Sequence, residues 1–418
     1  MYARKRLDIS WTDLASGMLY ACFRRDERSA ARAVEQWFAP APAGGEPGAV
    51  AFLSVRSGLD LYLRLLDLPR GSEVLMSALT IPDMCKVIEE HGLVPVPVDL
   101  DPRTLAPDEA RLRALCGPKT KAILIAHLFG TRIDLEPCAR VARERGLLLL
   151  EDSAQAFTGP EYKGDARADV TMFSFGPIKT ATALAGGVLV VRDASMCARL
   201  RAEQARYPLQ SSRAYFGRMW KYALLKFLTL PLSYTLFVRF CALRGRGMDE
   251  VIQGTVRGFK GGDFFEKIRH RPSAALLRLV GRRLAAADGR RIAERTRAAL
   301  QLRAHLGTRC ELPGGDAPFH SYWVFTLASA NPGTLVERLR AAGFDATQAA
   351  TLRPVAVPAT RPESEPRVAA ELLARTVYVP LYPEMPTRAI DELARVLLEV
   401  AGREPAPVAP ALGLSHSA

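Results

Sequence analysis

The 418-residue sequence lacks several features that would place it in other classes of protein. The basic N-terminus is followed by polar and acidic residues, so the apolar core of a signal peptide is missing. The seven cysteines stand singly, with no C-x-x-C pair and no histidine cluster at zinc-ligand spacing. The most apolar run, residues 227–238, has twelve uncharged residues interrupted by Pro231, whereas roughly 20 are needed to span a bilayer. We therefore expect a cytoplasmic protein with reduced thiols, no metal site and no membrane-spanning helix.

Positive charge is concentrated in one part of the chain. The net charge is +13, and residues 201–300 contain 21 basic and 7 acidic side chains, so the remainder is close to neutral. This distribution favours an anionic partner at one place, which could be a phosphorylated substrate, an anionic lipid or a nucleic acid. The arginines alternate with leucine and alanine at helical spacing and are not clustered with exposed aromatic residues, which argues against nucleic acid.

Residues 49–192 alternate short apolar runs with amphipathic stretches. Such alternation with short connections predicts an α/β fold, in which helices cover both faces of a mostly parallel sheet. Ligands in this architecture bind beyond the carboxyl ends of the strands. The predicted strands are 50–55, 73–77, 94–98, 122–126, 147–151, 170–174 and 187–191, and the predicted helices are 59–66, 83–91, 107–115 and 135–145.

The rest of the chain predicts a second, smaller domain. Residues 276–305 have the pattern of one long basic helix, and residues 318–400 return to an α+β pattern. The last sixteen residues are rich in proline and alanine, which is typical of a disordered tail. The predicted parts are an N-terminal helical segment (1–48), a large α/β domain (49–275) with an insertion at about 205–260, a small C-terminal α+β domain (276–402) and a tail (403–418).

The 205–260 insertion combines apolar and basic side chains at helical spacing. Within residues 218–246, aromatic and leucine residues such as Trp220 and Leu224 are flanked by cations such as Lys221. An apolar helix face bordered by cations is typical of a helix that lies at a membrane surface. The alternative, which we favour, is a helical hairpin that packs on the large domain or in a dimer interface.

Two residues at strand ends indicate the chemistry. An apolar run ends in Glu151 and Asp152, which places an acid at the carboxyl end of a buried strand, where a carboxylate needs a partner cation. A protonated pyridine nitrogen is such a partner. Lys179 follows the next strand, 27 residues after Asp152. At the mouth of the same sheet, partial burial and nearby cations would lower the pKa of this lysine and favour imine chemistry.

These segments resemble the DegT/StrS family of aminotransferases that depend on pyridoxal 5′-phosphate (PLP) and have fold type I. The resemblance rests on EDSAQAF (151–157), FSFGPIK (173–179) followed by two glycines, the stretch 71–101 and VPLYPEMPT (379–387), in the family's order. It covers most of the chain apart from about 205–260. The resemblance implies a homodimeric enzyme of amino-sugar biosynthesis. Such an enzyme would use PLP to move an amino group from an amino acid, glutamate by family habit, to a keto-sugar nucleotide.

The resemblance also assigns roles to individual residues. Lys179 would hold PLP as a Schiff base and carry protons, and Asp152 would keep the pyridine nitrogen protonated. Gln155 would lie beside the ring oxygen of the cofactor, and Ser174 would donate a hydrogen bond to its phosphate. The backbone of Gly58, with that of the following residue, would supply further phosphate donors at a helix N-terminus.

Three positions depart from the family pattern. Leu59 and Asp60 stand where the phosphate turn usually has threonine or serine, which removes a hydroxyl donor and adds an acid. Ile81 stands where many members stack an aromatic ring on the pyridine, so the stacking would be aliphatic. Arg269 aligns with an asparagine that reaches the phosphate of the neighbouring subunit, and arginine could replace it as a phosphate partner.

Several alternatives stay open at this point. A PLP enzyme of the same fold could act on a lipid-linked or amphiphilic carbonyl compound, as a peripheral protein at the inner membrane face. A same-fold dehydratase is disfavoured, since such members tend to replace the lysine that Lys179 matches. The three departures would also suit a non-catalytic regulatory or membrane-associated homologue. His127 and His320 lie near strand ends and are interpreted as structural, outside the catalytic set.

Overall fold

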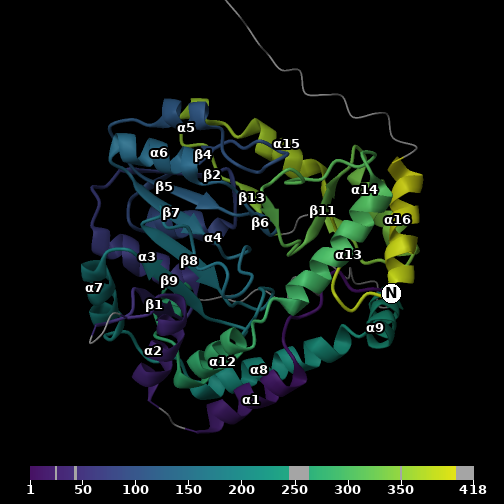
Figure 1. The fold of residues 1–418 in the computed structure, drawn as a ribbon, viewed down its shortest axis with the longest axis horizontal. Coiled ribbons are helices and arrows are strands. Elements are labelled where there is room, and N and C mark those ends of the chain that lie inside the picture. Colours follow the sequence, from purple (N-terminus) through teal and green to yellow (C-terminus); the bar gives the residue numbers. More distant parts are fainter. Residues whose placement is uncertain (24–25, 42–44, 244–262, 349–350, 402–418) are drawn as a thin grey trace, which may run out of the picture.

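The computed structural model describes residues 1–23, 26–41, 45–243, 263–348 and 351–401. Its larger domain is built around a mixed seven-stranded sheet with helices on both faces (Figure 1). Adjacent strands are parallel except where β9 pairs with β8 on one side and with β1 on the other. The predicted α/β fold is therefore confirmed. In spatial order the strands are β1 (Ala49–Phe52), β9 (Gly187–Val191), β8 (Val170–Ser174), β7 (Leu148–Asp152), β5 (Thr120–Ala126), β2 (Glu73–Ser77) and β4 (Val94–Val98).

The first strand is shorter than predicted, and the difference positions a helix end. The sequence pattern predicts a strand at 50–55, but β1 ends at Phe52. Ser54 instead caps helix α3 (Val55–Leu66), because its hydroxyl accepts a hydrogen bond of 3.2 Å from the amide of Ser57. Since β1 runs in the same direction as β8, the N-terminus of α3 lies at the carboxyl end of the parallel strands.

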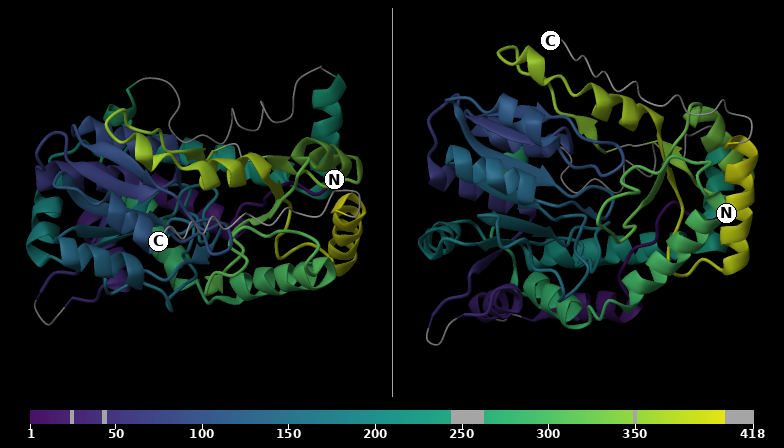
Figure 2. Two further views of the ribbon diagram at one scale, coloured as in Figure 1. Left: turned by 90° about the horizontal axis from the view of Figure 1, so that it is seen from above. Right: turned by 45° about the horizontal axis from the view of Figure 1, so that its top comes forward.

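Three apolar cores surround the sheet, and each contains residues from a different group of helices. The first lies on one face of the sheet, and the other two lie on the opposite face. Helices α1, α8 and α12 lie side by side along one edge of the molecule (Figures 1 and 2). The first group is α3, α4 (Pro82–Glu90) and α7 (Ala194–Gln204); the second is α5 (Glu109–Leu115) and α6 (Glu136–Arg145); the third is α1 (Trp11–Cys22), α2 (Glu27–Phe38), α8 (Ser212–Leu228) and α12 (Ala274–Ala285).

The prediction of one long helix at 276–305 is wrong. Two helices occupy this stretch, α12 and α13 (Arg290–Leu306), and the residues between them include Gly289 with a left-handed φ of +72°. Glycine adopts this conformation without the steric cost of a Cβ atom, so the chain turns here. Because Leu276 and Leu284 of α12 pack in the same core as α1 and α2, the domain boundary lies between α12 and α13 and not at residue 276.

The smaller domain has its own core, built from α13 and the elements that follow it. Its α+β pattern is as predicted, with a three-stranded antiparallel sheet in the order β11-β14-β12. Short strand pairs, β13 with β3 and β10 with β6, connect it to the larger domain. The remaining elements are β3 (Leu79–Thr80), β6 (Thr131–Arg132), α11 (Phe264–Ile268), β10 (Phe319–His320), β11 (Phe325–Ala328), α14 (Pro332–Ala341), β12 (Thr347–Gln348), β13 (Arg353–Pro354), a 3-10 turn (Pro362–Ser364), α15 (Arg367–Arg375), β14 (Thr376–Val379) and α16 (Thr387–Ala401).

The described part of the 205–260 insertion is helical, as predicted. It forms α8 and α9 (Pro231–Leu243), and Tyr215, Met219 and Tyr222 of α8 are buried against the core of the larger domain. Over the residues that the structure describes, every helix is too short or too polar to cross a membrane. Residues 244–260 of the insertion and the predicted tail at 403–418 lie outside the described residues.

Candidate active site

Asp152 and Ser174 mark the site, because they are the last residues of two adjacent parallel strands. Side chains alternate between the two faces of a strand. Leu150 and Met172, two residues earlier, pack in the core beneath α3, so Asp152 and Ser174 lie on that same face. The N-terminus of α3 is at the same end of the sheet. The site is therefore at the carboxyl ends of β7 and β8, where the sequence places it.

Lys179 lies in the loop between β8 and β9, and distant parts of the chain hold this loop in place. Within the loop, the hydroxyl of Thr182 donates a 2.6 Å hydrogen bond to the carbonyl oxygen of Gly176. Ala181 and Leu184 have left-handed φ angles of +53° and +66°, which non-glycine residues adopt only where the surroundings impose them. The external contacts are Ala181 N–H to Asp8 Oδ2 (2.9 Å), Tyr215 O–H to Ala183 O (2.8 Å) and Trp323 Nε1–H to Ile178 O (3.0 Å).

The Lys179 side chain is partly buried among charged and aromatic neighbours. Burial lowers its pKa to about 8, and the positive charge of Arg56 acts in the same direction, while the negative charge of Asp152 opposes both. The amine lies 4.6 Å from the centroid of the Trp323 ring. With this pKa, a larger fraction of the Lys179 amine is neutral near neutral pH than in an exposed lysine, and the neutral form is the one that attacks a carbonyl carbon.

The carboxyl group of Asp152 is held differently from that of its neighbour. Burial raises the pKa of Asp152, although the amide of Ala154, which donates a 2.9 Å hydrogen bond to Oδ1, and the charge of Lys179 act against it. An acid with a raised pKa gains from a further cationic donor, because such a donor favours the ionised form. The protonated nitrogen of a pyridine ring would supply one. The charges of Asp152 and Lys179 each act on the pKa of the other group, so the two side chains lie close enough to interact.

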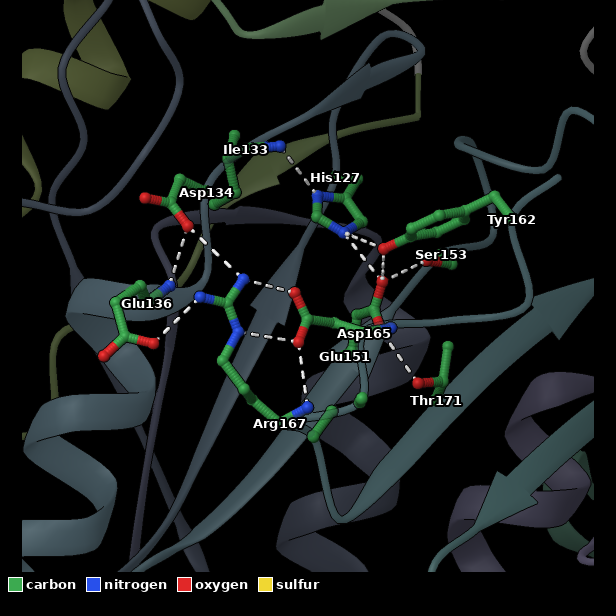
Figure 3. Close-up of polar contacts among 12 residues, drawn as sticks. His127, Ile133, Asp134, Glu136, Glu151, Ser153, Tyr162, Asp165, Arg167 and Thr171 are labelled. Atoms are coloured by element: carbon green, nitrogen blue, oxygen red, sulfur yellow. Dashed lines mark hydrogen bonds and ion pairs between the residues drawn. The ribbon is translucent and has the colours of Figure 1, made fainter.

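Glu151 points to the opposite face of the sheet and is saturated with hydrogen bonds (Figure 3). Burial alone would raise its pKa, but the hydrogen bond from His127, with those from the other donors, lowers it to about 2. His127 accepts at Nδ1 from the amide of Ile133 at 3.2 Å, so Nε2 is the nitrogen that donates to Glu151. This geometry supports the structural interpretation of His127. The donors are His127 Nε2 (2.9 Å), Ser153 Oγ (2.7 Å), Thr171 Oγ1 (2.7 Å), the amide of Asp165 (2.8 Å) and the Tyr162 hydroxyl.

Gly58 does not provide a free amide at the start of α3, which corrects the prediction for this residue. Its N–H donates within the helix to the carbonyl oxygen of Ser54 at 3.2 Å. A Cβ atom at this position would point into the core and lie 2.4 Å from Cδ1 of Leu189. Leu59 is likewise buried in that core. An α-helix leaves its first amides without intrahelical partners, so backbone phosphate donors at this helix start would have to come from residues that precede Gly58.

Ile81 and Gln155 both contact other parts of the larger domain. Ile81 is partly buried and precedes Pro82 at the start of α4. Gln155 Oε1 accepts a hydrogen bond of 2.9 Å from the amide of Phe129, so its NH₂ group is the part that can donate to a ligand. Their contacts with a cofactor stay predictions, as does the contact of Ser174 with its phosphate.

Arg269 is bound by carboxylates of its own chain. Its Nε and Nη2 donate to Asp60 at 3.0 and 2.9 Å, and Nη2 also contacts Glu90 at 3.0 Å. Burial acts to raise the pKa of Asp60, but hydrogen bonds from His91 and Arg269 lower it. The acid that replaces a hydroxyl in the phosphate turn is thus neutralised by these partners. A role for Arg269 at the phosphate of a neighbouring subunit stays a prediction, and it would compete with both carboxylates.

Comparison with known proteins relates part of this chain to a family. Residues 32–221 match the DegT/DnrJ/EryC1/StrS aminotransferase family. Over these residues, which make up less than half of the chain, the protein is similar to that family. GDP-perosamine synthase from Caulobacter vibrioides is 36% identical over 160 residues, which are 38% of this chain and 43% of that protein. The alignment therefore spans less than half the length of this curated relative.

Solved structures of aminotransferases share the fold over almost the whole chain. TlmJ from Streptoalloteichus hindustanus has a TM-score of 0.70 at 21% identity, with 96% of this chain and 99% of that chain covered. PseC from Helicobacter pylori, an aminotransferase involved in the biosynthesis of pseudoaminic acid, gives a TM-score of 0.69 at 16% identity, with 96% and 99% covered. The fold extends well beyond the matched residues 32–221 and includes the smaller domain.

The chain's own residues fit the PLP of this family. The Lys179 amine and the Asp152 carboxyl group influence each other at the carboxyl edge of the sheet, and the N-terminus of α3, a position that suits a phosphate, lies at the same edge. Sequence reasoning missed Arg56 and Trp323. The position of Arg56 beside the phosphate turn could have indicated a role in the site. The sequence around Trp323 predicts a strand and gives no indication of a contact with Lys179. That contact joins residues 144 positions apart, which no local pattern reveals.

Proposed function

We propose that this chain is a PLP-dependent aminotransferase that moves an amino group from an amino acid, glutamate by family habit, to a keto-sugar nucleotide. The main support for this proposal is that the charges of Lys179 and Asp152 act on each other's pKa in a desolvated region beyond the ends of adjacent strands. Names of relatives support the choice of acceptor. GDP-perosamine synthase aligns at 36% identity over 160 residues, and the DesI structure, at 20% identity, was determined with its TDP-sugar product.

The residues of the site divide the work of such a reaction. PLP, when bound, supplies an aldehyde that takes up amino groups and a ring that withdraws electrons. Lys179 would provide Nζ, which would hold the aldehyde and, when free, accept and return protons. Asp152 would provide a carboxylate that keeps the ring nitrogen protonated. The start of α3 and the hydroxyl of Ser174 would hold the phosphate, and Trp323 covers the amine from the side of the smaller domain.

A trapping experiment tests this function. Purified protein incubated with PLP is expected to turn yellow, and borohydride should bleach it and leave the cofactor attached to Lys179. Lys179→Ala should remain colourless, while Lys119→Ala, which removes an exposed lysine at a distance from the site, should behave like the wild type. Colourless wild-type protein would instead favour a non-catalytic homologue.

The acceptor is identified by mass. Glutamate and a panel of keto-sugar nucleotides should give an amino sugar nucleotide, whereas loss of a hydroxyl from the sugar without gain of nitrogen would indicate a dehydratase. A panel of lipid-linked carbonyl compounds tests the alternative substrate class. We further propose a homodimer, because the family builds each site at a subunit boundary; sedimentation at micromolar concentration measures this.

A second candidate role follows from one exposed helix face. In α8, four apolar side chains form a stripe along the solvent side: Phe216, Trp220, Leu224 and Phe227 are 38, 67, 57 and 52% exposed. Helix α8 contains four basic residues and no acidic residue. A stripe of this kind with cations beside it suits the surface of an anionic membrane. We therefore propose a cytoplasmic enzyme with peripheral membrane contact through this face, which would suit a lipid-linked acceptor.

The membrane proposal has a direct test. Wild-type protein should sediment with vesicles that contain phosphatidylglycerol and release at high salt, and the pair Trp220→Glu and Leu224→Glu should abolish binding. If these changes instead convert a dimer to a monomer without any vesicle binding by the wild type, the stripe is a subunit interface.

A further inference from the structure

Two further cations lie beside the Lys179 site, and neither belongs to the machinery described above. Lys5 reaches the site from the N-terminal segment, and its amine lies 3.6 Å from the centroid of the Trp323 ring. The Lys179 amine lies 4.6 Å from the same centroid. The Lys5 amine also makes a long contact of 3.4 Å with the carbonyl oxygen of Trp323. Trp323 thus brings Lys5 into the immediate surroundings of Lys179.

Arg295 is the second cation, and part of its guanidinium lacks a partner. The residue is only 8% exposed, and its Nε donates a 2.9 Å hydrogen bond to the carbonyl oxygen of Ser321. Its Nη2 is buried, and no described residue accepts a hydrogen bond from it. A buried donor without an acceptor costs roughly 1–3 kcal/mol, and more when the group is charged. Arg295 contacts Ser321 and Lys5 contacts Trp323, so both cations bind the same three-residue segment.

The nearby acid does not neutralise these cations. Asp8 is the carboxylate whose charge acts on both Lys5 and Arg295. Its oxygens are already used by Arg283 (3.2 Å), Arg291 (3.0 Å) and the amide of Ala181 (2.9 Å). Burial, then repulsion from Arg295 and Lys179, lowers the pKa of Lys5. Burial lowers the pKa of Arg295 to about 10. The site therefore has an excess of positive charge that an anion would relieve.

We propose that Lys5 and Arg295 form a carboxylate-binding subsite that holds the amino donor while its amine reaches the Lys179 site. This inference rests on the proposed aminotransferase function. A carboxylate suits a guanidinium nitrogen and an ammonium group as donors. The carboxylates of an amino acid lie within a few bonds of its amine, so cations that border Lys179 can hold them. In a nucleotide sugar the diphosphate is separated from a ring carbonyl by the sugar, which places it farther away.

The test measures binding of glutarate, a dicarboxylate that lacks an amine and cannot react. Calorimetry on the protein in the presence of PLP should show binding that weakens with salt, and Lys5→Met should reduce the affinity at least about tenfold, as for loss of a charge-assisted contact. Arg295→Lys, which keeps the charge but loses the fork of donors, should also weaken it. Lys163→Met is a matched control, because Lys163 lies 4.8 Å from the centroid of Trp37, outside the site.

The outcomes separate this inference from the proposed function. Glutarate affinity that is equal in wild type and Lys5→Met, including no measurable binding by either, overturns the subsite. Loss of nucleoside diphosphate binding in Lys5→Met with glutarate binding intact also overturns it, because the cations would then serve the acceptor. Borohydride trapping of PLP on Lys179 should persist in Lys5→Met, so failure of trapping in the wild type counts against the function alone. With glutamate as donor, Lys5→Met should raise the KM for glutamate and leave that for the acceptor unchanged.

Discussion

The indole nitrogen of Trp323 donates a 3.0 Å hydrogen bond to the carbonyl oxygen of Ile178, the residue that precedes Lys179. The ring of the same tryptophan lies 4.6 Å from the Lys179 amine. One side chain near the start of the smaller domain therefore both anchors the lysine loop and covers its reactive group. The position of the amine relative to Asp152 depends on how the two domains pack.

Trp323→Phe should keep an aromatic ring near Lys179 but remove the hydrogen bond to Ile178. A hydrogen bond of this kind contributes about 1 kcal/mol, so we expect capture of PLP by Lys179 to slow about fivefold, measured by the growth of the Schiff-base absorbance. Trp220→Phe changes an exposed tryptophan of α8 and serves as the control. An unchanged rate in Trp323→Phe would show that the loop is held without this contact.

Capture of PLP should depend on pH with a midpoint near that of the Lys179 amine. Because burial lowers its pKa to about 8, the neutral amine is scarce at pH 6.5 and abundant at pH 9, and the rate of imine formation should rise between them. The charge of Asp152 opposes this lowering. Asp152→Asn should therefore move the midpoint to lower pH, and a shift to higher pH would contradict the shared site.

Glu151→Gln should destabilise the protein without removing any residue of the site. The glutamine loses the charge and presents an NH₂ group to donors such as Tyr162 and Ser153, so we expect a loss of at least about 2 kcal/mol in the free energy of unfolding at pH 7. The control is Glu161→Gln at an exposed position, which should change it by less than about 0.5 kcal/mol.

The pH dependence of this loss has a definite sign. The pKa of Glu151 is lowered in the folded state, to about 2, so its stabilising effect is complete above the ordinary value of 4.5 and is lost as the pH falls toward 2. The difference between wild type and Glu151→Gln should narrow over this range. Urea titrations at pH 7 and pH 3 measure it, and a constant difference would mean that ionisation of Glu151 contributes nothing.

Gly58→Ala should destabilise the larger domain, because the added Cβ would lie 2.4 Å from Leu189 and 3.0 Å from Phe52. Overpacking of this kind costs roughly 1–3 kcal/mol. Gly217→Ala is the matched control, since a Cβ there meets nothing within 4 Å in the middle of α8. That change should stabilise the protein by up to about 1 kcal/mol. Thermal unfolding of the two variants should shift in opposite directions.

Local patterns predicted the sheet and the two residues at its carboxyl edge. The strands, Asp152 and Lys179 are recognisable because apolar runs and the residues that end them are contiguous in sequence. The break between α12 and α13 was missed, since Gly289 interrupts a stretch whose helical pattern continues on both sides. The ion-pair partners of charged side chains could not be predicted either. Asp60 pairs with Arg269, which is 209 positions away, so the sequence around Asp60 does not show that its charge is neutralised.

The first residues of the chain act as a strap between the two domains. Tyr2 forms a β-bridge with Phe344 in the smaller domain, and six residues later Asp8 accepts the amide of Ala181 in the lysine loop. Few residues separate Tyr2 from Asp8, so a movement of the smaller domain would also displace the contact between Asp8 and the lysine loop. Protein shortened by eight residues at this end should therefore look folded by circular dichroism yet retain PLP poorly during dialysis, and an affinity tag is better attached at the C-terminus.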